Sequence, residues 1–256
     1  MSGDSRTGFA SVVFDCDSTL AAIEGIDELA GPHAEAIREM TELAMQGILP
    51  LEEVYGRRLS LIRPTRARVD ELGRRYLDAL VPDAAEVVAA LLWLGKAVRV
   101  LSGGLRPPVE AVAGALGLPP GAVEAVAVHF DASGEYLGFD DASPLARNGG
   151  KPEVIAGWRL PRPALLIGDG VTDLEARASV DAFAAYMGVA DRPRVAAGAD
   201  FVLADASLAP VLALAASPDD RTRLADSRWS GLLARGDALL AAGRGAEEFT
   251  ASTRTR

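Results

Sequence analysis

Two carboxylates one residue apart, Asp15 and Asp17, stand directly after the apolar run Ser11–Phe14. This run is rich in β-branched and aromatic residues, as buried strands are. In open α/β sheets the ligand crevice lies outside the carboxyl ends of the strands, so a strand that ends in carboxylates carries charge into a crevice. Taken alone, the pair is better explained by an Asp-rich turn, because aspartate is common in turns. Other segments of the chain decide between the two interpretations.

Two later apolar runs end in the same way. Val98–Leu101 is followed by Ser102, and Ala164–Ile167 is followed, after one glycine, by Asp169. The glycines beside these residues allow a ligand to approach the backbone closely. Lys151 stands at the start of a predicted helix. If the strands are parallel, the strand-end side chains meet at one edge of the sheet.

Several carboxylates in one crevice repel one another and need a cation. An all-oxygen set of ligands suits Mg²⁺, which keeps several waters and often binds a substrate phosphate oxygen as well. Lys151, Ser102 and exposed backbone N–H groups would then contact the phosphate. The residue types at this edge therefore predict phosphoryl transfer.

The elements that position these residues alternate between strands and helices. Further strands are predicted at 182–186 and 201–203, and a β-hairpin over 123–130 and 135–139. This alternation predicts an α/β fold with a doubly wound parallel sheet.

The domain organisation is predicted from where helical patterns interrupt the strands. Residues 1–20 and 82–215 are expected to form the α/β core, and the helical block 21–81 a small cap inserted after the first strand. A block in that position lies where a lid belongs. Residues 216–256 are expected to be a C-terminal helical extension, with an amphipathic helix at about 219–241 and a disordered end.

The composition is that of an ordinary globular protein, with 256 residues, 49% of them apolar and 24% charged. A net charge of −10 argues against nucleic acid or an anionic membrane as partner. Cys16 is the sole cysteine and the N-terminus lacks a signal pattern, so we expect a cytoplasmic protein. With two histidines and one cysteine, zinc clusters and Cys–His nucleophiles are excluded. Catalysis must use carboxylates, hydroxyls, lysine and arginine.

Four motifs in order carry a resemblance to a known family: DCDST at 15–19, SGG at 102–104, Lys151 and GDGVTD at 168–173. Together they resemble the haloacid dehalogenase superfamily of aspartyl phosphatases, whose fold is a Rossmann-like core. Within it the phosphoserine phosphatase family is more similar still. The segments EGIDELA, REMTELAMQGILP and RLSLIRP resemble the helical cap of that family, and the resemblance covers about residues 11 to 214.

The resemblance implies roles for the acidic residues. Asp15 is the expected nucleophile, which becomes an aspartyl phosphate. Asp17 is expected to protonate the departing oxygen and then to deprotonate the attacking water. Mg²⁺ would be held by Asp15, Asp169 and the backbone carbonyl of Asp17, with Asp173 in support.

The resemblance also implies roles in phosphate binding. Ser102 and Lys151 would stabilise charge on the transferring phosphoryl group and act in catalysis. The phosphate-binding residues would be Ser102, Gly103 and Gly104, and the backbone N–H of Gly103 would donate to the phosphate.

Substrate choice is expected to lie in the cap. Glu24 suits the ammonium group of phosphoserine, and Arg58 suits its carboxylate through a bidentate pair. The family commonly has phenylalanine where this chain has Leu51 and Leu105. A smaller residue at either position reshapes the substrate pocket and bears on the exact substrate more than on the chemistry.

The expected activity is Mg²⁺-dependent hydrolysis of L-phosphoserine to L-serine and phosphate, the last step of serine biosynthesis. Two alternatives stay open: a related phosphatase or phosphotransferase that acts on another amino-acid or small-metabolite phosphate, and a phosphate-sensing protein without catalysis. The sensor predicts loss of a key acid or of Lys151, and all are present. The helix predicted at about 219–241 is expected to dock either on the α/β core or on a second subunit. In the second case the protein would form a homodimer.

Overall fold

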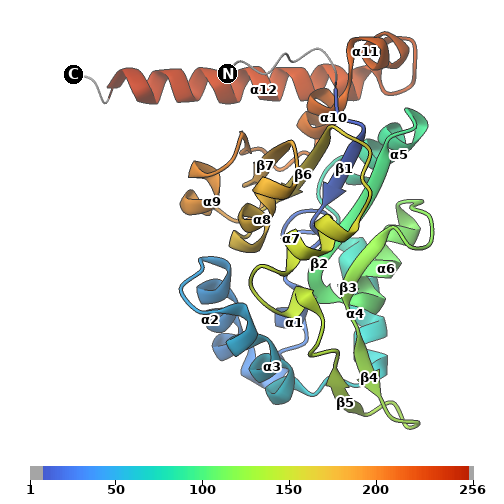
Figure 1. Ribbon diagram of the computed structural model, residues 1–256, viewed down its shortest axis with the longest axis vertical. Helices are drawn as coiled ribbons and strands as arrows, with labels where there is room; N and C mark the ends of the chain where they lie inside the picture. Colours follow the sequence, from blue (N-terminus) through green and yellow to red (C-terminus); the bar gives the residue numbers. More distant parts are fainter. Residues whose placement is uncertain (1–7, 254–256) are drawn as a thin grey trace.

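The computed structural model describes the backbone of residues 8–253 and the side chains as far as Gly243 (Figure 1). Its centre is a six-stranded sheet in which every pair of neighbours is parallel. The strand order is β3-β2-β1-β6-β7-β8. The strands are β1 (Ser11–Phe14), β2 (Ala97–Leu105), β3 (Val123–Val126), β6 (Ala164–Gly168), β7 (Ala182–Tyr186) and β8 (Phe201–Leu203). The predicted α/β fold with a parallel sheet flanked by helices is confirmed.

The strand order reverses at β1. From there the chain builds outward through β2 and β3 on one side, and through β6, β7 and β8 on the other. Such a reversal is where open α/β sheets bind their ligands. β1, β6 and β7 are buried along their whole length, as expected for parallel strands covered on both faces.

Helices follow or precede each strand of the sheet. They are α5 (Ala84–Trp93), α6 (Arg106–Ala115), α7 (Gly150–Gly157), α8 (Val171–Glu175), α9 (Pro193–Ala197) and α10 (Ala209–Ala215), with short 3₁₀ turns at Pro144–Ala146 and Ala176–Ser179. α5 packs against both β2 and α10, and α6 packs against β2 and β3.

Four helices lie between β1 and α5 in the chain, and we refer to them as the cap helices. They are α1 (Gly25–Glu28), α2 (Ala34–Met45), α3 (Leu51–Ile62) and α4 (Arg66–Asp78), with a 3₁₀ turn at Gly31–His33. α2 packs on α3, whereas α4 packs along α6 beside the sheet. Figure 1 shows α1, α2 and α3 gathered at one end of the molecule. The domain boundaries predicted from the sequence stay a prediction.

The predicted hairpin over 123–130 and 135–139 is wrong in its first half. Residues Val123–Val126 form β3, which pairs in parallel with β2 in the main sheet. The hairpin itself is shorter and joins β4 (Val128–Phe130) to β5 (Tyr136–Phe139). This segment buries the side chains of Val123, Ala125 and Val126. It pairs with β2 and not with β5, because that pairing buries its apolar side chains in the main sheet.

The C-terminal segment contains two helices where the sequence predicts one. α11 (Pro218–Ala225) is capped by Ser217 and Asp220, and α12 (Ser230–Thr253) follows. α12 packs on α10 and crosses the end of the molecule opposite α1 to α3 (Figure 1). The predicted disordered end lies partly in the helical backbone up to Thr253, and residues 254–256 lie outside the described part. A role of this segment in a homodimer stays a prediction.

Within residues 8–253, no helix combines the length and apolar character needed to cross a membrane.

Candidate active site

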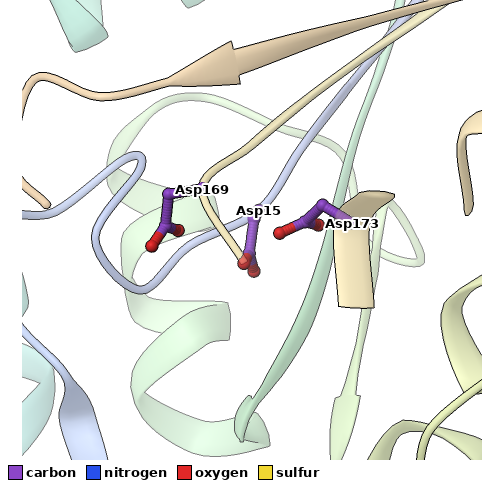
Figure 2. A group of neighbouring side chains, drawn as sticks. All are labelled: Asp15, Asp169 and Asp173. Atoms are coloured by element: carbon purple, nitrogen blue, oxygen red, sulfur yellow. The ribbon is translucent and has the colours of Figure 1, made fainter. Parts of the chain in front are cut away.

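Three buried aspartates meet at the carboxyl edge of the sheet. Asp15 follows β1, Asp169 follows the neighbouring strand β6, and Asp173 lies in the first turn of α8. Figure 2 shows the three side chains next to one another with Asp15 between the other two, and one carboxylate oxygen from each lies within 4.8 Å of the others. The parallel sheet therefore brings Asp15 next to two acids that stand far later in the chain, at positions 169 and 173.

Lys151 is the cation on one side of this cluster. It is buried in the first turn of α7, and its Nζ lies 2.9 Å from Asp15 Oδ2 and 2.6 Å from Asp173 Oδ1. Burial alone would lower the pKa of Lys151, but the two carboxylates outweigh burial and raise it. The lysine is therefore held charged and aimed at Asp15.

Lys151 alone does not offset the negative charge of three carboxylates. Burial, with Asp15 nearby, raises the pKa of Asp169 to about 7 and that of Asp173 to about 8. Asp169 Oδ2 is buried and lies 3.0 Å from Arg192 Nε, in a geometry that does not make a hydrogen bond. Three carboxylate oxygens converging in a buried site form the ligand set that hard divalent cations take in proteins. The donor set thus fits a divalent metal.

Asp17 points away from the cluster, toward the cap helices. Its carboxylate accepts hydrogen bonds from the Gly25 N–H at 3.0 Å and from the Tyr76 hydroxyl. Burial, followed by the charge of Asp15, raises the pKa of Asp17 to about 6. The carboxylate of Asp17 is thus outside the three-acid group. The predicted metal contact through its carbonyl stays a prediction.

The Ser102–Gly104 segment belongs to the end of β2, so the strand is longer than predicted. Ser102 is fully buried, and its Oγ accepts a hydrogen bond of 3.0 Å from the Gly104 N–H. A Cβ at Gly104 would lie 2.8 Å from Asp17 Oδ2, so any larger residue would have to displace that carboxylate. The hydroxyl of Tyr55, on α3, donates to the Gly103 carbonyl at 2.8 Å. This segment therefore contacts both the acids and a cap helix.

Glu24 and Arg58 line the same pocket as Asp15, Lys151 and Asp169. The Glu24 Oε1 accepts a 2.8 Å hydrogen bond from the Ser18 hydroxyl, and burial raises the pKa of Glu24 well above its usual range. Arg58 is buried on α3. The two residues proposed to select the substrate thus border the pocket that contains the acids.

Arg192 is the principal residue that the sequence analysis missed. Its side chain is 4% exposed; Nε lies 3.0 Å from Asp169 Oδ2 and Nη2 lies 3.3 Å from Glu24 Oε1. It therefore joins an acid of the core to an acid of the cap region. Arg192 follows β7, the next strand beyond β6. It stands six residues past the end of that strand, so the strand-end argument, which singles out residues directly after an apolar run, does not reach it.

Asn148 connects a core loop to the start of α3. That helix begins after Pro50 with no side-chain cap of its own. Instead, the Leu51 N–H donates to Asn148 Oδ1 at 3.1 Å, and the Asn148 N–H donates to Glu52 Oε2 at 3.1 Å. A residue of the core thus caps a cap helix, and it stands three residues before Lys151.

With the sheet, the acid cluster and its lysine described, comparison with protein families gives the class. The model of the haloacid dehalogenase-like hydrolases matches residues 12–178. This protein belongs to that family.

Relatives of known name agree on one activity. The chloroplastic phosphoserine phosphatase of Arabidopsis thaliana is 41% identical over 200 residues, covering 75% of this chain and 68% of the relative. The phosphoserine phosphatase of Rattus norvegicus is 40% identical over 201 residues, covering 76% of this chain and 89% of the relative. Among solved structures, a phosphoserine phosphohydrolase-like protein from Francisella tularensis has a TM-score of 0.70 at 25% identity, with coverage of 76% and 95%. The structure of a phospho-aspartyl intermediate analogue of phosphoserine phosphatase also has a TM-score of 0.70, at 24% identity, and covers 80% of this chain and 98% of that chain. This likeness shows that the two proteins share a fold.

Proposed function

We propose that this protein is a phosphoserine phosphatase that hydrolyses L-phosphoserine to L-serine and phosphate. The observation that carries the proposal is the shared pocket: Asp15 and Lys151 border it on the core side, and Glu24 and Arg58 on the cap side. Relatives that bear this name at about 40% identity over three quarters of the chain support the same substrate.

Asp15 is the proposed nucleophile. Its carboxylate oxygen attacks phosphorus, the bond from phosphorus to the seryl oxygen breaks, and an aspartyl phosphate forms. The 2.9 Å contact from Lys151 fixes the carboxylate and brings a positive charge to the transferring phosphoryl oxygens. Water then attacks the aspartyl phosphate and releases inorganic phosphate and free Asp15.

Asp17 is the proposed acid and base. With a pKa of about 6, it carries a proton at neutral pH far more often than a free aspartate with a pKa of about 3.9. In the first step that proton goes to the seryl oxygen as the oxygen leaves. In the second step the Asp17 carboxylate takes a proton from the attacking water.

Mg²⁺ is the proposed cation, with Asp15, Asp169 and Asp173 as its carboxylate ligands. The cluster is built from oxygen donors alone, which favours Mg²⁺ over the softer transition metals. When bound, the cation offsets negative charge on the phosphoryl group.

Glu24 and Arg58 are the proposed substrate-selecting residues. Arg58 would pair with the substrate's carboxylate, and Glu24 with its ammonium group. Ser102, Gly103 and Gly104 would surround the phosphate between these two charges and Asp15.

The test is release of inorganic phosphate from L-phosphoserine, with Mg²⁺ and with EDTA. The wild type should release phosphate only with the metal, and Asp15→Asn should release none above background. Asp141→Asn is the matched control, because Asp141 is exposed and outside the pocket. Activity on a generic aryl phosphate but little on L-phosphoserine would refute the substrate and keep the chemistry. Metal-dependent transfer to an added hydroxy amino acid, in place of hydrolysis, would favour a phosphotransferase.

A further inference from the structure

The guanidinium of Arg58 is tied to two residues that the proposed mechanism does not use. Nη1 of Arg58 donates to the hydroxyl of Thr41 at 2.7 Å. The Thr41 hydroxyl in turn donates to Asp27 Oδ1 at 2.5 Å. Asp27 belongs to α1, Thr41 to α2 and Arg58 to α3, so this chain of hydrogen bonds ties three cap helices together.

The direction of these hydrogen bonds is fixed by chemistry. A guanidinium has donors and no acceptor, so Thr41 Oγ1 must accept from Arg58. The single hydroxyl proton is then free for Asp27, whose carboxylate accepts it. Thr41 is buried, so water does not readily replace either partner. The charge of Asp27 therefore polarises the hydroxyl that holds Arg58.

Arg58 keeps a donor for a ligand. Its Nε is buried and has no hydrogen-bond partner in the described part of the chain. Arg58 also lines the pocket that holds Asp15 and Lys151, and its Cζ lies 5.6 Å from the centre of the Tyr55 ring. One end of the guanidinium is thus fixed by Thr41 while another donor stays unused. Such an arrangement pre-organises an arginine for a carboxylate.

We propose that Thr41 and Asp27 are positioning residues that hold Arg58 in the orientation that binds the substrate's carboxylate. The proposal rests on the proposed function, in which Arg58 recognises that carboxylate. It adds that selection of a carboxylate depends on a hydroxyl and an acid that do not touch the substrate. Without the hydroxyl, Arg58 loses its fixed partner and must be ordered by the substrate itself.

The test compares L-phosphoserine with O-phosphoethanolamine, which has the same phosphate and ammonium groups and lacks the carboxylate. Thr41→Val keeps the shape of the side chain and removes the hydroxyl. It should lower kcat/KM for L-phosphoserine by about 10- to 100-fold, mainly through KM, the size of a lost charge-assisted hydrogen bond. For O-phosphoethanolamine the loss should stay below about threefold. Thr41→Ser retains the hydroxyl and should recover most of the loss.

Thr222→Val is the control, because Thr222 is an exposed threonine on α11 outside the pocket. Equal losses on both substrates in Thr41→Val, or no loss on L-phosphoserine, would overturn the proposal, as would a Thr41→Ser variant as poor as Thr41→Val. A wild type that does not prefer L-phosphoserine would refute the proposed function instead. In that case the crystal structure of Thr41→Val decides: a displaced Arg58 guanidinium supports the positioning role, and an unmoved one overturns it.

Discussion

Replacing Arg192 by methionine should lower the free energy of unfolding of the metal-free protein by about 3–5 kcal/mol near neutral pH. The side chain is 4% exposed and its guanidinium lies 3.0 Å from Asp169 and 3.3 Å from Glu24. Methionine fills similar volume but leaves both carboxylates buried without their cation. Removing one partner of a buried ion pair costs this much because the other charge stays uncompensated.

Bound metal should offset part of the loss. Mg²⁺ at about 100 times its Kd adds about 2.7 kcal/mol to any protein that binds it only when folded. In the variant, Asp169 is no longer paired with Arg192, so Mg²⁺ does not have to compete with a guanidinium for that carboxylate. We therefore expect Mg²⁺ to stabilise Arg192→Met more than it stabilises the wild type.

The assay is urea unfolding followed by circular dichroism, in EDTA and in Mg²⁺. Arg192→Lys keeps the charge and should lose less stability than Arg192→Met. Arg194→Met is the control, because Arg194 is exposed and donates one 3.2 Å hydrogen bond to the Gln46 carbonyl. If Arg192→Met in EDTA unfolds within about 1 kcal/mol of the wild type, as a surface arginine variant would, the buried-cation argument is wrong.

Two further variants test contacts outside the acid cluster. Asn148→Ala removes the acceptor for the Leu51 N–H, so it should lower the free energy of unfolding by about 1 kcal/mol and speed hydrogen exchange in the first turn of α3. Asn148→Asp keeps an acceptor and should do neither. Equal exchange rates in the two variants would contradict the capping role. Burial opposes ionisation of Asp220, but hydrogen bonds from Lys96 and Ser217 outweigh burial and lower the pKa of this carboxyl. The ionised Asp220 therefore stabilises the folded protein above its unfolded pKa of about 3.9, and this stability is lost as the pH falls through the folded pKa. Asp220→Asn should therefore cost about 2 kcal/mol in urea unfolding near pH 7, with a difference from wild type that shrinks below about pH 4; a constant difference would refute the assignment.

The strands at the centre of the sheet could be predicted because their signal is local. β6 and β7 are continuous apolar runs, as burial on both faces requires, and each stands close to a charged residue, Asp169 after β6 and Asp181 before β7. β3 could not be predicted in this way. It shares its apolar pattern with the following hairpin strand, and only its pairing with β2, more than twenty residues earlier, assigns it to the main sheet. Choice of a pairing partner is set by tertiary packing, which a local pattern does not contain.

The acid cluster could be predicted for a related reason. Asp15 and Asp169 each follow an apolar run, and parallel pairing of β1 with β6 puts the two strand ends side by side. Arg192 has no such pattern around it, because it lies in a loop between β7 and α9. Its partner Glu24 is 168 residues away, so the pair exists only once the sheet has formed.

The same long-range contacts join Arg58, the proposed carboxylate-binding residue, to Lys151, the proposed phosphate-binding residue. Asn148 caps α3, which carries Arg58, and it lies three residues before Lys151, which holds Asp15 at 2.9 Å. A displacement of α3 away from the core must therefore break the Asn148 contact or move the loop that leads into the helix of Lys151. Hydrogen bonds of this kind are broken at a cost of about 1 kcal/mol each, well within what binding of a charged substrate supplies. The positions of Arg58 and Lys151 are thus coupled through a short loop. A substrate that engages both residues, as we propose, favours the arrangement in which both are in place.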